Sequence, residues 1–122
     1  MLKRFGFFEE CSPNSALQDL RELQLMGPLD EEELVLQYLM NGTMLFEAES
    51  CAFDRFQDGK IPIAPPDVYS DGEWCWSRDV LYYIRHYHIA VESQFFDWMI
   101  YNQWKCPKIV SAEALVQANW QT

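Results

Sequence analysis

The Asp71-Gly72 pair is the feature that most narrows what this chain can fold into. It lies between two short arms, 68–69 and 74–76, that are rich in aromatic residues. Asp-Gly in such a setting is a strong signal for a tight turn between antiparallel strands. The sequence therefore predicts a small β-hairpin over residues 68–76.

Helical patterns flank this hairpin. The clearest begins at Asp30, which is the expected N-cap because Glu33 follows three residues later, as in a capping box. Asn41-Gly42 is the expected end of that helix. The expected class is α+β, mainly helical, with about five helices and a small antiparallel hairpin. The other four helices are predicted over residues 14–25, 78–87, 93–103 and 112–118.

Capping and burial patterns add detail to these helices. Ser77 and Ser111 are expected to cap the third and fifth helices with their hydroxyl groups. Residues 43–48 fit either a short strand or a loop. The three prolines of 61–66 predict an extended segment, since proline disfavours helix at and before its own position. The fourth and fifth helices are expected to bury Phe95, Phe96, Met99, Ile100, Leu115 and Val116.

A chain of 122 residues with 49% apolar residues is long enough to form one core, so we expect a single domain over residues 1–122. The sequence starts like a secretory signal, with Lys3 and Arg4 before a short apolar patch, but Glu9 and Glu10 follow immediately. No apolar run approaches the roughly 18 residues that a membrane span needs. These features favour a cytoplasmic protein.

Charge is the strongest indication of function. The formal net charge is −10, which argues against nucleic acid or an anionic membrane as the main partner, because both require a basic face. Residues 1–61 carry a net charge of −7 and residues 62–122 a net charge of −3. This excess fits either simple solubility or a surface complementary to a basic protein.

Patterns for catalysis and metal binding are weak. The four cysteines form no C-x-x-C pair, so we predict reduced thiols and no zinc or redox site. His86 and His88 are two residues apart and would not share a helix face. Cysteine–histidine catalysis would need one of them beside Cys75 or Cys106, and the charges nearest Cys75 do not favour a thiolate. We therefore predict no catalytic residue, no metal site and no cofactor.

The segments 71–76, 79–83 and 95–96 resemble a pattern in small bacterial immunity-type proteins of polymorphic or contact-dependent toxin systems. In that pattern a DGxWxW turn precedes a YY…Y helix, and an Asn-x-Trp-like end follows, which residues 102–104 match. The resemblance covers roughly residues 35–108. The chain departs from it at two steps, with Trp76-Ser77 in place of Trp-Pro and Val91-Glu92 in place of Leu-Pro.

This resemblance, together with the charge, predicts a cytoplasmic immunity protein. Such a protein would bind a basic toxin domain, for which a nuclease is the leading candidate, and occlude its active site without any catalysis. A regulatory or interaction module that forms homodimers is the alternative, and a small hydrolase using carboxylates or a cysteine is a third class. The residues predicted to contact the partner are Asp30, Glu31, Glu32, Asp71, Glu73 and Trp74.

Overall fold

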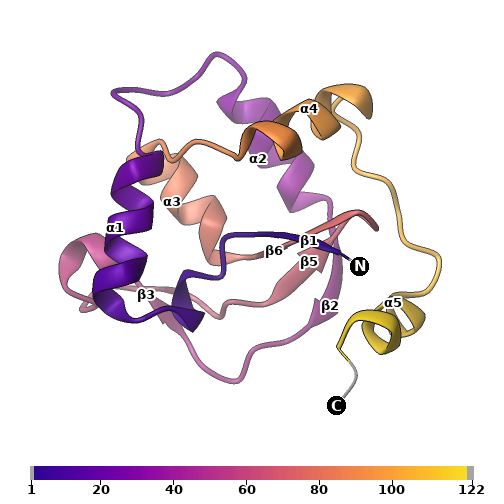
Figure 1. Cartoon of the computed structure of the whole chain (residues 1–122), viewed down its shortest axis with the longest axis horizontal. Helices are drawn as coiled ribbons and strands as arrows, with labels where there is room; N and C mark the ends of the chain where they lie inside the picture. Colours follow the sequence, from indigo (N-terminus) through magenta and orange to yellow (C-terminus); the bar gives the residue numbers. More distant parts are fainter. Residues whose placement is uncertain (1, 121–122) are drawn as a thin grey trace.

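The computed structural model describes residues 2–120 and contains two β-sheets (Figure 1). The larger sheet has four strands in the order β1-β6-β5-β2, and the smaller one pairs β3 with β4. Both sheets are built from short strands. Their bounds are β1 (Lys3–Phe5), β2 (Thr43–Phe46), β3 (Ala52–Phe53), β4 (Pro62–Ala64), β5 (Val68–Ser70) and β6 (Trp74–Ser77).

The predicted hairpin is present as β5 and β6. The two strands are antiparallel, with Val68 opposite Ser77 and Ser70 opposite Cys75. The hairpin is not isolated, however, because β2 pairs with β5 and β1 pairs with β6. Strand β1, which the sequence did not predict, runs parallel to β6 with Phe5 opposite Trp76. The sheet is therefore larger than expected and of mixed direction.

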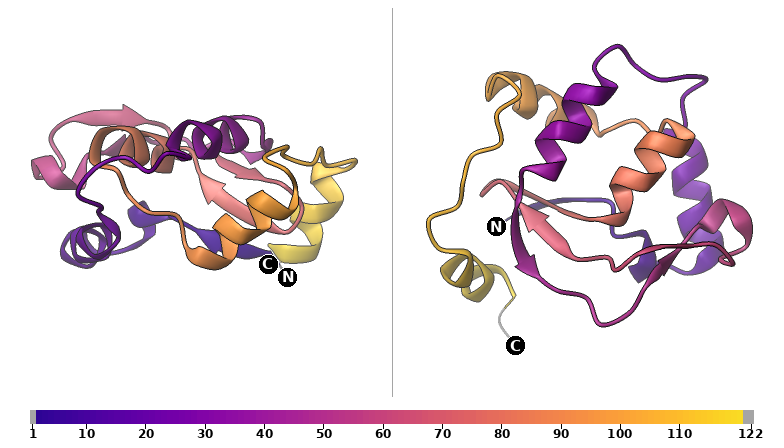
Figure 2. Two further views of the ribbon diagram at one scale, coloured as in Figure 1. Left: turned by 90° about the horizontal axis from the view of Figure 1, so that it is seen from above. Right: turned by 180° about the vertical axis from the view of Figure 1, so that it is seen from behind.

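Five α-helices occur within residues 2–120, which confirms the expected α+β class. Helices α2 and α3 lie side by side along the rear of the molecule in the view of Figure 1. Helices α1 and α4 lie toward the front, as the view from above shows (Figure 2). The helix bounds are α1 (Pro13–Leu23), α2 (Glu32–Met40), α3 (Asp79–Tyr87), α4 (Ser93–Tyr101) and α5 (Ala112–Asn119), with 3-10 turns at Phe8–Glu10 and Arg55–Gln57.

Two predicted helix caps are wrong. Helix α2 begins after Glu31, which caps it only with its backbone, and no side chain forms a cap bond there. Asp30 therefore lies in the preceding turn, outside the capping box that the sequence suggested. Ser77 is the last residue of β6, and its hydroxyl accepts a hydrogen bond from the Phe7 N–H at 3.2 Å. By contrast, Ser111 caps α5 as predicted, accepting from the Ala114 N–H.

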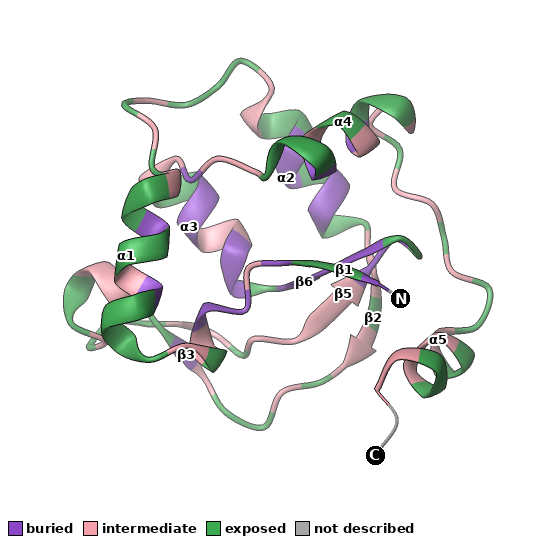
Figure 3. Ribbon diagram, viewed as in Figure 1, coloured by how far each residue is buried: buried purple, intermediate pink, exposed green. Residues whose placement is uncertain are grey.

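The main core lies between the larger sheet and helices α1 to α4, and its buried residues are purple in Figure 3. Trp74 of β6 stacks on Phe95 of α4, with ring centroids 4.6 Å apart. Trp76 approaches Gly42 so closely that a Cβ there would lie 2.4 Å from the indole. The glycine is therefore required by packing.

Burial on the last two helices differs in part from the prediction. Phe95 and Met99 are buried, Phe96 is half-buried, and Ile100 is 49% exposed. Ile100 is exposed because α4 presents one narrow stripe to the core, and residues four apart such as Phe95 and Met99 fill it. Helix α5 buries no residue fully, although Leu115 packs against a small second cluster around Cys75.

None of the helices in the described part of the chain combines the length and the apolar character that crossing a bilayer requires.

Candidate functional site

The β5–β6 turn is organised around the carboxylate of Asp71. One oxygen accepts hydrogen bonds from the backbone N–H groups of Glu73 (2.8 Å) and Trp74 (2.7 Å). The other accepts from the Tyr38 hydroxyl at 2.6 Å and from the Trp98 indole N–H at 3.0 Å. Helices α2 and α4 are thereby tied to the hairpin, and burial together with Asp71 raises the pKa of the Tyr38 hydroxyl.

This geometry changes the role expected for the hairpin residues. Asp71 is 5% exposed and Trp74 is 2% exposed, so neither side chain is accessible to a partner in this structure. Both were predicted as contacts because charged and aromatic residues in a turn commonly lie at the surface. Glu73 is exposed as expected, and its carboxylate pairs with Lys3 at 3.3 Å.

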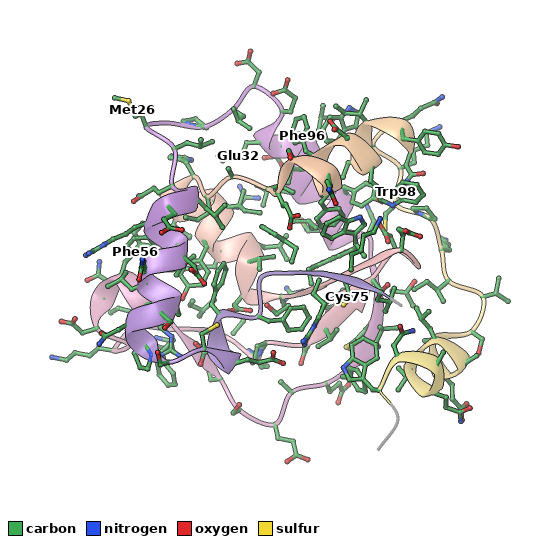
Figure 4. All side chains as sticks on the ribbon, in the orientation of Figure 1. Met26, Glu32, Phe56, Cys75, Phe96 and Trp98 are labelled. Atoms are coloured by element: carbon green, nitrogen blue, oxygen red, sulfur yellow. The ribbon has the colours of Figure 1, made fainter. Side chains whose placement is uncertain are left out.

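The acidic run before α2 lies elsewhere. Asp30 is exposed, while Glu31 and Glu32 are half-buried. The Glu32 carboxylate is 2.7 Å from Nδ1 of His88, at the end of α3. Glu31 and Glu32 lie at the start of α2, whereas Asp71 contacts Tyr38 near the C-terminal end of the same helix. Figure 4 labels Glu32 and Trp98, which mark the two separate places. The six predicted contact residues therefore do not form one patch.

The structure instead brings other carboxylates together at the front. Asp19 and Glu22 of α1 and Glu92 at the start of α4 surround a cavity of about 300 Å³, which we call the front hollow. Its floor is apolar and includes Phe5, Phe8 and Leu23, contributed by β1, the first 3-10 turn and α1. The front hollow thus combines negative walls with an aromatic floor.

The front hollow is also low in balancing charge. Its one lining cation is Arg4, whose guanidinium pairs with Glu10 at 3.0 Å. Within residues 2–120, Asp19, Glu22 and Glu92 form no ion pair. Three carboxylates therefore face solvent without a cationic partner, which gives this surface a negative potential.

Sequence reasoning missed these three residues for two different reasons. Asp19 and Glu22 are three apart on the polar side of a helix, so their shared face could have been read from the spacing. Glu92 lies 70 positions further along the chain, and no local pattern indicates its approach to α1. Gln24 and Ile89 form an isolated antiparallel bridge that holds the end of α1 beside the segment before α4. This bridge brings Glu92 close to Asp19 and Glu22.

A second polar cluster lies at the start of α3, with Asp79 at its buried end. Asp79 is 0% exposed, and neither of its oxygens accepts a hydrogen bond from a described residue. Burial raises the pKa of the Asp79 carboxyl, and the Ser77 hydroxyl and the Asp79 backbone N–H, which lie nearby without forming a well-aligned hydrogen bond, lower it in part. The Glu9 carboxylate raises this pKa further, and Arg55 lowers it. Arg55 itself pairs with Glu9 at 3.0 Å. Asp79 itself is enclosed and offers no access to a substrate, whereas Glu9 and Arg55 are partly exposed.

The cysteines and histidines lie apart from one another. All four thiols are free, as predicted. Burial raises the pKa of Cys75 to about 11 and that of Cys106 to about 12, which disfavours the nucleophilic thiolate. His88 pairs with Glu32, and His86 packs against the Tyr82 ring. Within residues 2–120 no three metal-ligating side chains converge on one point.

No known protein-family model matches the chain, and no curated protein or solved structure matches it significantly.

Proposed function

We propose that this chain is a cytoplasmic immunity protein that binds the basic domain of a toxin, with a nuclease as the leading candidate, and occludes its active site. The observation that carries the proposal is the front hollow, where three unpaired carboxylates surround an aromatic floor. The net charge of −10 and the resemblance to immunity-type proteins support it.

The front hollow has the chemistry to receive a long cationic side chain. The stem of an arginine or lysine can lie on Leu23, which is half-buried, above the nearly covered rings of Phe5 and Phe8, while its charged head reaches the carboxylates at the rim. A nuclease binds phosphates with such cations, so carboxylates that take the place of phosphates would compete for the same groups. Opposed fields would also speed the encounter. No catalysis by the chain is needed for this mechanism.

Charge reversal of the front hollow tests the proposal. The triple variant Asp19→Lys, Glu22→Lys, Glu92→Lys is compared with the matched control Glu47→Lys, Glu49→Lys, Glu113→Lys, which changes exposed carboxylates outside the hollow by the same total charge. The ligand is the basic protein that co-purifies with the chain from its native host, and its binding is measured by calorimetry. We expect the hollow variant to bind about 100-fold more weakly and the control to bind within about threefold of the parent.

Two outcomes count against the proposal. Equal loss in both variants would show that total charge, and not the front hollow, determines binding. Failure of co-purification from the native host to recover any basic partner would remove the immunity function itself. Circular dichroism of each variant confirms that the fold is intact.

One observation favours the homodimer as a second candidate. Helix α4 leaves Ile100 49% and Tyr101 76% exposed, and Leu34 of α2 is 44% exposed. The Trp98 and Tyr101 rings stack at 5.4 Å, which gives this surface a rigid aromatic element. Light scattering across a dilution series separates the candidates, because a dimer that survives dilution without any basic partner supports self-association.

A further inference from the structure

The rear of the molecule carries a second hollow with the opposite charge. A groove of about 280 Å³ runs between the end of α2, strand β4 and helix α3, and we call it the rear groove. Helices α2 and α3 border it on the face seen from behind in Figure 2. Its lining includes Met40, Ile63, Leu81, Tyr82, Arg78 and Arg85.

Both arginines are available to a ligand. Arg78 is exposed and forms no ion pair with any residue of the described chain. Arg85 is 54% exposed at its side chain and has only a long 3.9 Å contact with Glu33, which is itself 65% exposed. A pair of this length between solvent-exposed groups contributes little to stability, so it would not prevent exchange for a better partner.

The position of Arg78 is unfavourable for the fold itself. It is the N-cap of α3, and its side chain makes no capping bond. The helix dipole places partial positive charge at this end, which disfavours a cation there. The Arg78 guanidinium has no ion-pair partner among the described residues, whereas a bound anion would be attracted by both the dipole and the guanidinium.

The surface between the arginines is apolar. They are seven positions apart, which corresponds to about 10 Å along the α3 axis. Leu81 and Tyr82 occupy the interval, and Met40, 56% exposed, borders it from α2. The Tyr82 hydroxyl donates to Asp54 at 2.7 Å, so the ring is held in place and offers its apolar part to the groove.

We propose that the rear groove binds an acidic segment of a protein partner, with two carboxylates about 10 Å apart and an apolar side chain between them. The carboxylates would pair with Arg78 and Arg85, and the apolar side chain would pack on Leu81, Tyr82 and Met40. Arginine forks suit carboxylates because two parallel N–H groups can donate to the two oxygens.

The observations favour a peptide over other anions. The two arginines are separated by apolar surface, so a single compact anion such as phosphate could satisfy only one of them. Nucleic-acid binding typically neutralises about 6–10 phosphates, far more than two guanidinium groups can provide on a chain of net charge −10. This inference is independent of the proposed immunity function, because the rear groove lies on the face opposite the front hollow.

The experiment uses the full chain and a fluorescein-labelled peptide, Glu-Glu-Leu-Phe-Glu-Glu, in fluorescence anisotropy at low salt. We expect saturable binding that weakens about fivefold for Arg78→Ala and for Arg85→Ala, and at least about 20-fold for the double variant. Arg21→Ala, which removes an exposed arginine from α1, is the matched control and should bind like the parent. The backbone amide signals of Leu81 and Tyr82 should shift in NMR spectra on titration.

Three results would overturn the inference. One is the absence of saturable binding up to about 1 mM peptide, the weakest affinity that still indicates a specific site. Another is binding that the double arginine variant retains. The third is complete displacement of the peptide by inorganic phosphate at equal concentration, which would identify a small anion as the occupant. Because Arg78 and Arg85 are exposed and Arg78 is unfavourable for α3, the variants should unfold at or slightly above the parent temperature, so loss of binding can be separated from loss of fold.

Discussion

The two ends of strand β6 hold two buried aspartates in opposite situations. Asp71, before the strand, accepts four hydrogen bonds, from Tyr38, Trp98 and two backbone N–H groups. Asp79, after the strand, is fully buried and accepts none from the described residues. A buried carboxylate stabilises a fold only when donors surround it, because desolvation otherwise exceeds the gain. Asp71 therefore raises the free energy of unfolding, while Asp79 lowers it.

The largest expected effect is at Asp71. Asp71→Ala would leave the Tyr38 hydroxyl and the Trp98 indole N–H buried without their acceptor and would release the turn. We expect a loss of about 4 kcal/mol in the free energy of unfolding, measured by urea denaturation with tryptophan fluorescence. Asp19→Ala, at an exposed helix position, is the control and should change stability by less than about 0.5 kcal/mol. A loss of stability in Asp71→Ala as small as that in Asp19→Ala would show that the hydrogen bonds to Asp71 do not stabilise the fold.

The next effect has the opposite sign. Asp79→Asn removes a carboxylate that has no donor, so we expect the variant to be more stable than the parent by about 1 kcal/mol at neutral pH. The same urea titration measures it. Destabilisation by this substitution would show that Asp79 makes a favourable interaction that its lack of hydrogen bonds does not reveal.

The difference in stability between Asp79→Asn and the parent should also depend on pH, with a smaller expected effect. The pKa of Asp79 is raised in the folded protein, so the folded state retains this proton at pH values where the unfolded state has released it. The contribution to stability is therefore present below the unfolded pKa of about 3.9 and is lost as pH rises through the folded value. The advantage of Asp79→Asn over the parent should grow with pH over this window. A difference independent of pH would mean that the Asp79 pKa is not raised.

The smallest effect should appear at Cys75, in the middle of the same strand. Its thiol is buried, with a pKa of about 11, so at pH 8 only about one molecule in a thousand carries the thiolate. Labelling by Ellman's reagent must wait for the strand to open. We expect labelling about twofold to fivefold slower in Asp79→Asn than in the parent. Equal rates in the variant and the parent would show that Cys75 reacts without β6 opening.

Local chemistry explains which parts of the fold the sequence predicted. The Asp71-Gly72 turn and the Ser111 cap depend on neighbours a few residues away, and the structure confirms both. Strand β1 escaped prediction because its partner lies far along the chain: Phe7 and Ser77, joined by a hydrogen bond, are 70 residues apart. In addition, Lys3 and Arg4 before an apolar patch resemble the start of a secretory signal and not a strand.

The candidate site was harder to predict for the same reason. An aspartate in a turn is usually exposed, and nothing near Asp71 in sequence shows that Tyr38 and Trp98 converge on it. The front hollow depends on Glu92 approaching Asp19 and Glu22 from another helix, so its carboxylates could be counted but not placed. The net charge could therefore be predicted from the sequence, while the grouping of Asp19, Glu22 and Glu92 around one hollow could not.

The parallel pairing of β1 with β6 has a consequence for synthesis of the chain. A ribosome that adds about 5–20 residues per second completes β6 roughly 4–14 s after β1. During that interval Phe5, Phe7 and Phe8 have been made, but much of the surface that later covers them has not. The rate of translation between β1 and β6 therefore determines how long these three phenylalanines stay uncovered in the nascent chain.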